Sequence, residues 1–560
     1  MEKSDFVIIG GVAAGPKTAA VLARRLPDAK ITLFQKEKYI SYGTCGLPYF
    51  ASGDINSFEE LTQTSYGVPR SVDFFKNTKG FDVKIESEVI AIDRKAKVIT
   101  VKSLQTGEEY QHSYGKLVIA AGANPSKSPF PVAESPRIKP FTRPEDAINF
   151  RKLAQTGQVG TAVVVGGGFI GCEVAEAAGG LWGIEVTLLE RENQLLPYVL
   201  DPEMAELVER EMNRQDVKVQ TGCEVESITV DNDGNPVVKV KGCNNIAADY
   251  VFVCLGVKPE TRLAIACELE LGSTGGIKVN KHLQTSDPDI YAAGDCIESV
   301  NKLTGKPLYI PMGSLANRQG RVIAENLAGH EAEFPGVVGA FLVKIFDINV
   351  GAVGLSEQAA NKAGLKANTI WGSFPDKPDY YPEYQTFTIK MLYDDDTDRL
   401  LGLQAIGKGD ICRRVDVFSS FLQQDGTLQN LLDFEQGYAP PYSEALDPLF
   451  QLASAALAQN EGLKFVSPGK KLATLSDGAF WLDVREKDEV EADPWPYAEQ
   501  HQPANIPLND LRDRIDEIDK SKKVMIICKR GPRSYQAALI LKHAGFKDIE
   551  IVGGGLTALK

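Results

Sequence analysis

Two apolar segments, each followed by a glycine turn and a helix-like stretch, constrain the fold of this chain most strongly. The first of the two is residues 5–10 (DFVIIG), which lead into GGVAAG and then into a stretch at 16–26 with a helical pattern. This stretch is followed by a further apolar run, residues 30–35 (KITLFQ), that completes the first unit. Short continuous apolar runs are typical of buried parallel strands. Strand, glycine turn, helix and strand in this order predict a Rossmann-like unit whose helix N-terminus faces a pyrophosphate.

This first unit departs from the strict GxGxxG pattern at two positions. Val12 stands where the pattern requires a glycine, and Gln35 stands where an acidic residue is expected. Glutamine can still hydrogen-bond a ribose hydroxyl, so the sequence predicts a modified nucleotide site. A Rossmann-like turn without a ligand is the alternative interpretation.

The second unit keeps the full pattern. A strand predicted at 161–165 (TAVVV) precedes Gly166, Gly168 and Gly171. A further strand predicted at 185–190 ends at Glu190, about 20 residues past the last glycine. A carboxylate at that place accepts hydrogen bonds from the ribose hydroxyls and repels a 2′-phosphate, which favours NADH over NADPH.

A third motif, IYAAGD at 290–295, is a predicted strand that ends in Asp295. Its carboxylate could accept a hydrogen bond from a flavin ribityl hydroxyl or order water near the pyrophosphate. Residues 117–125 (LVIAAGANP) and 251–259 (VFVCLGVKP) are predicted to be the strand-to-loop crossings that join two nucleotide-binding domains.

Two cysteines stand in segments typical of reactive thiols. Cys45 lies in SYGTCGLPY, and Cys528 lies in CKRGPRS at the end of an apolar strand. Loop amides and the helix predicted at 534–544 should converge on Cys528, and Arg530 and Arg533 add positive charge. Such a setting stabilises an anionic sulfur.

The composition excludes several classes of protein. A formal net charge of −14 argues against nonspecific DNA binding. The N-terminus lacks signal-peptide features, and no run of 18 apolar residues predicts a transmembrane helix. The nine cysteines contain no CxxC pair, which is typical of free thiols in a reducing cytoplasm and argues against structural zinc. We expect no metal site.

Residues 5–455 resemble the FAD-dependent pyridine nucleotide-disulfide oxidoreductases, in particular the single-cysteine branch that includes coenzyme A-disulfide and NADH-dependent persulfide reductases. The motifs that carry this resemblance are GGVAAG, CGLPY, LVIAAGANP, GGGFIGCE, AAGD, LANRQGR and YAPPYS. The C-terminal segment resembles a single rhodanese domain through FWLDVREKDEV, CKRGPRS and GGGL.

The resemblance implies an α/β chain with two Rossmann-like nucleotide-binding domains for FAD and NADH, an α+β dimerisation domain and an α/β rhodanese domain. The expected boundaries are 1–144 plus 256–330 for the split FAD domain, 145–255 for the NADH domain, 331–455 for the dimerisation domain, 456–472 for a linker and 473–560 for the rhodanese domain.

The motifs and the resemblance together imply a set of cofactor-binding residues. They are Gly10, Val12, Ala13, Gly15, Gln35, Lys36, Ser41, Thr44, Ala121, Gly122, Gly166, Gly168, Phe169, Ile170, Gly171, Glu173, Glu190, Gly256, Gly294, Asp295, Leu315 and Ala316.

The implied activity is reduction of a coenzyme A persulfide or polysulfide, and possibly coenzyme A disulfide, by a cytoplasmic homodimer. Cys45 would be the redox thiol and Cys528 the carrier of sulfane sulfur, assisted by Arg533 and by Tyr380, Tyr438 and Tyr442 of the dimer interface.

One departure bears on coenzyme A. Disulfide-reducing relatives carry Ser-Phe-Ala-Asn before the cysteine, whereas this chain has Thr44 in place of the asparagine. Two alternatives stay open: an NADH oxidase or peroxidase that uses a Cys45 sulfenic acid, and a flavin-based sensor of redox state or sulfide.

Overall fold

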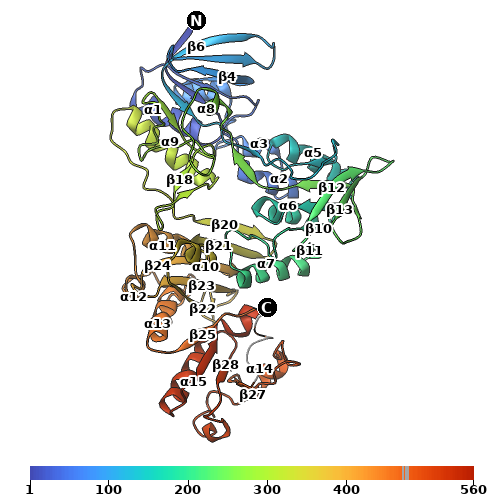
Figure 1. Cartoon of the computed structure of the whole chain (residues 1–560), viewed down its shortest axis with the longest axis vertical. Helices are drawn as coiled ribbons and strands as arrows, with labels where there is room; N and C mark the ends of the chain where they lie inside the picture. The colour runs from blue at the N-terminus through green and yellow to red at the C-terminus, as the bar shows by residue number, and fades with distance from the viewer. Residues whose placement is uncertain (470–471, 473–477, 560) are drawn as a thin grey trace. The chain divides into compact units, whose positions relative to one another are not determined.

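The computed structural model describes residues 1–469, 472 and 478–559. The chain forms two compact units, one of Met1–Leu189 with Glu224–Val337 and the other of Glu190–Cys223 with Val338–Lys560. Figure 1 shows the course of the chain.

The first unit contains a seven-stranded sheet in the order β3-β2-β1-β6-β5-β4, with β17 also paired to β6. Its strands are β1 (Glu2–Ile9), β2 (Ile31–Phe34), β3 (Asp82–Lys84), β4 (Ser87–Asp93), β5 (Val98–Ser103), β6 (Glu109–Ile119) and β17 (Ile290–Ala292). The pairs β1–β2, β1–β6 and β6–β17 are parallel. Residues on both sides of the second nucleotide-binding unit thus build one sheet, because β17 pairs with β6.

Helices cover this sheet and join it to the next. Helix α1 (Ala14–Arg25) packs against α9 (Gly313–Leu327) (Figure 1). The shorter helical elements are η1 (Thr44–Gly46), α2 (Leu47–Ser52), α3 (Phe58–Leu61), α4 (Val72–Phe74), η2 (Phe75–Lys79) and α8 (Arg262–Ala266). The fully buried side chains of Val7, Ile8 and Leu117 lie in the core beneath them.

The second parallel sheet of this unit has the strand order β10-β9-β15-β8. Its elements are β8 (Ile138–Lys139), α5 (Pro144–Gln155), β9 (Thr161–Val165), α6 (Phe169–Gly179), β10 (Glu185–Leu189) and β15 (Tyr250–Val253). Short antiparallel pairings involve β7 (Ala123–Pro125), β12 (Val225–Val230), β13 (Pro236–Val240), β14 (Ile246–Ala247), β16 (Val257–Pro259), β18 (Ser299–Val300) and β19 (Pro307–Leu308). The two sheets confirm the prediction of two Rossmann-like units.

The second unit contains an antiparallel sheet in the order β20-β21-β24-β23-β22. The strands of this sheet are β20 (Phe341–Ile345), β21 (Ile348–Gly354), β22 (Ala367–Pro375), β23 (Thr386–Asp394) and β24 (Leu400–Gly407). The unit also contains strand β11 (Lys218–Gln220), which is not part of this sheet, and the helices α7 (Pro202–Arg214), α10 (Glu357–Ala363), α11 (Cys412–Gln423), α12 (Leu428–Leu432) and α13 (Pro448–Asn460). The fully buried ammonium of Lys390 in β23 lies 2.9 Å from Asp201 and 2.8 Å from Glu357. Burial opposes this charge, but the carboxylates outweigh it and raise the pKa of Lys390.

The C-terminal part of this unit is a parallel sheet in the order β25-β29-β28-β26-β27. Its elements are β25 (Lys464–Val466), β26 (Phe480–Asp483), α14 (Lys487–Ala492), β27 (Ala504–Asn505), η4 (Ile515–Glu517), β28 (Val524–Ile527), α15 (Pro532–His543), β29 (Ile549–Val552) and η5 (Gly555–Leu559). The helix predicted at 534–544 begins two residues earlier, because Pro532 is well suited to the first turn of a helix.

The segment 456–472, predicted as a linker, is partly regular structure. Its first residues continue α13, and β25 pairs in parallel with β29 of the C-terminal sheet. The apolar residues within its polar sequence account for this, because Leu463 is 3% exposed in the core of that sheet. Residues 470–471 and 473–477 lie outside the described residues, so the boundary at 472/473 stays a prediction.

No helix among the described residues is long and apolar enough to cross a membrane.

Candidate active site

The first glycine turn joins β1 to α1 and has the close backbone approach that the sequence predicts. Gly10 adopts φ +105°, and a Cβ there would meet the carbonyl oxygen of Ala120 at 2.0 Å. A Cβ on Gly15 would meet the carbonyl oxygen of Gly10 at 1.9 Å. Both positions therefore require glycine, while Val12 fits at the position between them.

Gln35 fastens this turn to the following loop. Its Oε1 accepts a hydrogen bond from the N–H of Gly11 at 2.8 Å, and its Nε2 donates to the carbonyl of Tyr39 at 3.1 Å. The side chain is buried. The predicted ribose contact stays a prediction, while the structural role of the amide explains why glutamine stands here.

The AAGD segment approaches the same turn from the other side. The N–H of Gly294 donates to Oε1 of Gln319 in α9 at 2.8 Å, and Gly294 lies beside Ala14 and Ala316. Burial raises the pKa of the half-buried Asp295 above its ordinary value, against a hydrogen bond from the backbone of Met312. Gln319 was not among the predicted site residues, because one buried glutamine in a helix has no distinctive sequence signal.

Cys45 lies in the 3₁₀ turn η1, directly before α2, and is exposed. Its pKa is raised, first by burial of the sulfur and then by the nearby carboxylates of Glu173 and Asp295. Because α2 packs against α6, the thiol and Glu173 of α6 belong to one region. The structure thus brings together Cys45, Glu173 and Asp295, which come from three separate motifs.

The second glycine turn joins β9 to α6. Gly166 adopts φ +110°, where a Cβ would meet the carbonyl of Cys254 at 2.3 Å. A Cβ on Gly171 would meet the carbonyl of Gly166 at 1.8 Å, whereas one on Gly168 would meet nothing within 4 Å. The open side at Gly168, the N-cap of α6, is the place where a pyrophosphate can approach the helix N-terminus.

Glu173 lies in the first turns of α6. Burial, reinforced by Glu176, raises the pKa of Glu173 to about 7. A carboxyl group with a pKa in this range can take up or release a proton near neutral pH.

Glu190 follows β10 directly, at the position predicted to bind ribose. It is 8% exposed, and its Oε1 accepts the N–H of Glu192 at 2.7 Å. Its contact with a nicotinamide cofactor stays a prediction.

Other predicted cofactor contacts lie in the loops of these turns. Lys36 forms an ion pair with Glu88 at 2.9 Å, and the N–H of Ser41 donates to the carbonyl of Gly11 at 2.7 Å. The remaining residues are placed as follows: Ala13 at the N-cap of α1, Thr44 in η1, Ala121 and Gly122 between β6 and β7, Phe169 and Ile170 in α6, Gly256 between β15 and β16, and Leu315 in α9.

Cys528 is the residue directly after β28 and is 1% exposed. The N–H of Gly531 donates to its Sγ at 3.1 Å, and Gly531 adopts φ +124° at the N-cap of α15. The loop therefore provides one backbone donor and a helix N-terminus to the sulfur, as the motif predicts.

Carboxylates that were not predicted from the sequence hold both arginines of this loop. Arg533 binds Glu489 through two hydrogen bonds, of 2.5 and 2.8 Å. Arg530 binds Asp379 through two more, of 2.9 and 2.6 Å. Asp379 precedes Tyr380, so this contact places the Cys528 loop next to a loop that carries a predicted catalytic tyrosine.

The predicted tyrosines are exposed, at 75% for Tyr380, 50% for Tyr438 and 71% for Tyr442. A hydrogen bond with Tyr438 is the main cause of a raised pKa at Tyr380. The structure brings these two tyrosines together. The catalytic role of Tyr442 stays a prediction.

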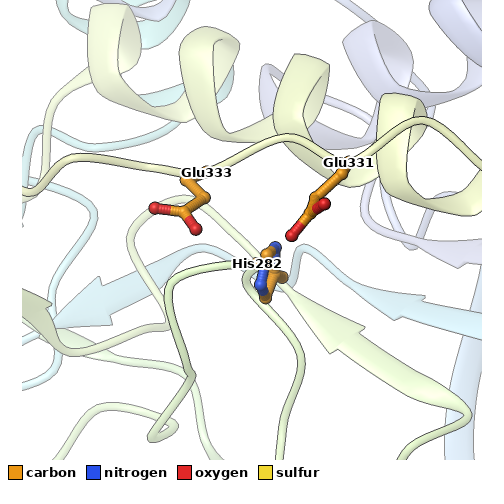
Figure 2. Close-up of side chains that lie close together, drawn as sticks. All are labelled: His282, Glu331 and Glu333. Carbon is orange, nitrogen blue, oxygen red and sulfur yellow. The ribbon is translucent and has the colours of Figure 1, made fainter.

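Outside these sites, His282, Glu331 and Glu333 lie close together (Figure 2), with potential metal-ligand atoms within 4.8 Å of one another. The Nδ1 atom of His282 is 3.0 Å from the carbonyl oxygen of Ala332, and Lys281 forms an ion pair with Glu333. Two of the three side chains are therefore already engaged within the protein.

Comparison with known proteins agrees with this geometry. Residues 4–314 match the family described as pyridine nucleotide-disulphide oxidoreductase, 341–449 match the dimerisation domain of that family, and 468–560 match the rhodanese-like domain. The solved structure of a NAD-dependent persulfide reductase from A. fulgidus superimposes with a TM-score of 0.93 at 37% identity, covering 99% of each chain.

Two curated relatives cover the region before the rhodanese-like domain. An NAD(P)H coenzyme A polysulfide/persulfide reductase of Pyrococcus horikoshii is 32% identical over 456 residues, which are 80% of this chain and 98% of that protein. An NADH oxidase of Methanocaldococcus jannaschii is 32% identical over 451 residues, 80% of this chain and 98% of that protein.

The chain therefore belongs to the pyridine nucleotide-disulphide oxidoreductase family and carries a C-terminal rhodanese-like domain. It is an enzyme of the class that uses FAD and a nicotinamide nucleotide. The two glycine turns fit such cofactors, because in each the last glycine lies against the first, and in the second turn Gly168 leaves open space at the N-terminus of α6. The predicted family, fold class and redox cofactors are confirmed.

Proposed function

We propose that this protein is an NADH-dependent flavoprotein reductase of coenzyme A persulfide or polysulfide that releases sulfide, with coenzyme A disulfide as a further candidate substrate. The observation that carries the proposal is the presence in one chain of a redox-type thiol, Cys45, and a rhodanese-like loop whose Cys528 sulfur accepts a backbone N–H. A reductase of plain disulfides needs no carrier of sulfane sulfur, whereas a persulfide reductase can use one.

The chemistry assigned to Cys45 is thiol exchange. The Cys45 thiolate attacks the sulfane sulfur of a persulfide, the S–S bond of the substrate breaks, and its thiol leaves while Cys45 retains the extra sulfur. FAD and NADH, when bound, supply the two electrons that release this sulfur as sulfide. The net reaction converts a persulfide, NADH and a proton into a thiol, hydrogen sulfide and NAD⁺.

Three side chains have defined roles in this proposal. The raised pKa of the thiol favours its protonated form, so a proton must leave before attack. Glu173, with a pKa of about 7, is suited to hold that proton. Tyr380, with Tyr438 as its hydrogen-bond partner, is assigned to protonate the leaving thiolate.

The assembly proposed for this activity is a homodimer. The family dimerisation domain and the three exposed tyrosines support it, because a second copy would cover apolar ring surface that otherwise faces solvent. The nine cysteines are scattered along the sequence without a CxxC pair, and this supports a reducing compartment such as the cytoplasm.

The competing function is an NADH oxidase or peroxidase with a Cys45 sulfenic acid, which the similarity to the M. jannaschii protein favours. Both functions need the same fold and cofactors. They differ in the electron acceptor and in whether sulfide is released.

The test is anaerobic turnover of coenzyme A persulfide by the wild type and Cys45→Ser. We expect one sulfide for each NADH oxidised and a loss of turnover of at least about a hundredfold in the variant. Oxidation of NADH only with peroxide or oxygen, and no sulfide, would replace this proposal by the oxidase. Binding of NADH without appreciable turnover of any of these acceptors would favour the flavin-based sensor.

A further inference from the structure

Three cationic residues follow Cys528 in its loop: Lys529, Arg530 and Arg533. The sequence predicts that the two arginines add positive charge next to the sulfur of Cys528. The structure divides them differently. Each arginine forms two hydrogen bonds with one carboxylate. Lys529 is exposed and forms no ion pair with any residue that the structure describes.

The pair between Arg533 and Glu489 is held from both sides. Two parallel hydrogen bonds join the groups, and Oε2 of Glu489 also accepts the N–H of Glu486 at 3.1 Å. The hydrogen bond from Arg533 is the first cause that lowers the pKa of Glu489, to about 2. Glu489 therefore stays ionised throughout the neutral range and continues to offset Arg533.

The pair between Arg530 and Asp379 is also fixed by its surroundings. The carbonyl of Arg530 accepts the N–H of Ser373 at 3.2 Å, which holds the thiol loop against the end of β22. The guanidinium then reaches Asp379 with two hydrogen bonds, and this contact lowers the pKa of Asp379. Neither arginine can turn to an incoming anion without losing its two hydrogen bonds to a carboxylate.

We infer that Glu489 and Asp379 determine the donor specificity of Cys528, restricting it to persulfide and polysulfide sulfur and excluding thiosulfate. Thiosulfate is a dianion, and its attack by a thiolate gathers three negative charges near the sulfur. A thiol persulfide brings at most one charge at its reacting end. A loop whose two arginines are already neutralised disfavours the first reaction far more than the second.

Both reactions are balanced without an added oxidant or reductant. The Cys528 thiolate forms a new S–S bond to the sulfane sulfur, and the old S–S bond of the donor breaks. The leaving group is a thiolate when the donor is a persulfide, and sulfite when the donor is thiosulfate. The two donors thus give the same product on Cys528 and differ only in the charge that the site must accept.

This inference rests on the proposed role of Cys528 as a sulfur carrier, and its test omits NADH. Full-length holoenzyme is mixed with glutathione persulfide or with thiosulfate, and the added sulfur on the Cys528 peptide is followed by mass spectrometry. We expect loading from the persulfide to be at least about tenfold faster, and no loading in Cys528→Ser.

Substitutions that remove the charge of Glu489 or Asp379 test whether these carboxylates set the donor specificity. Glu489→Gln and Asp379→Asn each leave one arginine uncompensated, so we expect the preference for persulfide to fall by about tenfold in each. Glu489→Asp keeps the charge and should retain the wild-type preference.

Matched controls are Glu491→Gln on the same helix and Glu383→Gln on the tyrosine loop. Both residues are exposed and form no ion pair with a described residue, so these variants should behave as the wild type.

Equal loading from both donors in the wild type would overturn the inference, as would an unchanged preference in both charge variants. Thermal unfolding of each variant shows whether it is folded. If Glu489→Gln does not fold, the donor preference of Asp379→Asn tests the inference in its place. If NADH-dependent sulfide release fails while selective loading persists, the proposed function is wrong and the donor specificity stands.

Discussion

Glu173 is a carboxyl group that the fold holds in an unfavourable setting for its charge. Burial and Glu176 raise its pKa from 4.5 to about 7. Between these values the folded protein binds more protons than the unfolded chain, so its stability falls as pH rises through this window. We expect a loss on the order of 2 kcal/mol between pH 5 and 8, which Glu173→Gln removes because the amide has no charge to bury.

The measurement for this prediction is the melting temperature of the holoenzyme without NADH, taken from pH 5 to 8. The variant should lose less stability with rising pH than the wild type does. Glu185→Gln, at an exposed position that starts β10, is the matched control and should follow the wild-type curve. Parallel curves for Glu173→Gln and the wild type would refute the assignment of this carboxyl as the titrating group.

The turn between β9 and α6 shows how one element uses its glycines for different purposes. Gly171 is needed by the fold, because a Cβ would lie 1.8 Å from the carbonyl of Gly166. Gly168 has open space beside it and φ −78°, which any residue adopts. We therefore expect Gly171→Ala to lower the melting temperature by several degrees. Gly168→Ala should leave the melting temperature unchanged and raise the KM for NADH.

Thermal unfolding and steady-state kinetics of both variants check this prediction in parallel. A melting temperature that falls equally in both would show that the two glycines share a structural role. An unchanged KM in Gly168→Ala would show that the pyrophosphate does not approach the helix at this position.

The same elements show how far the sequence could predict the site. Strand β9 spans the predicted residues, and both glycine turns have the predicted close approaches, because such features depend on neighbouring residues. The partners of Arg530 and Arg533 were not predictable, since Asp379 and Glu489 lie 151 and 44 residues away in the chain. Surface carboxylates are common, and only the folded arrangement selects these two.

At the scale of the whole molecule, the proposed homodimer makes a prediction about which chain supplies each catalytic group. We expect the substrate to bind at the dimer interface, with tyrosines from the second subunit facing the redox thiol. The exposure of Tyr380 and Tyr438 in a single chain is consistent with that arrangement. Cys45 of one subunit would then act with Tyr380 of the other, whose hydrogen-bond partner is Tyr438.

A mixed dimer of one Cys45→Ser chain and one Tyr380→Phe chain tests this arrangement. If the groups act across subunits, one site combines both substitutions and is inactive, while the other combines both native residues. The heterodimer, purified with two different tags, should then show about half the wild-type sulfide release, although each homodimer is severely impaired. If both groups come from the same chain, every site carries one defect, and the heterodimer should be no more active than the average of the two homodimers.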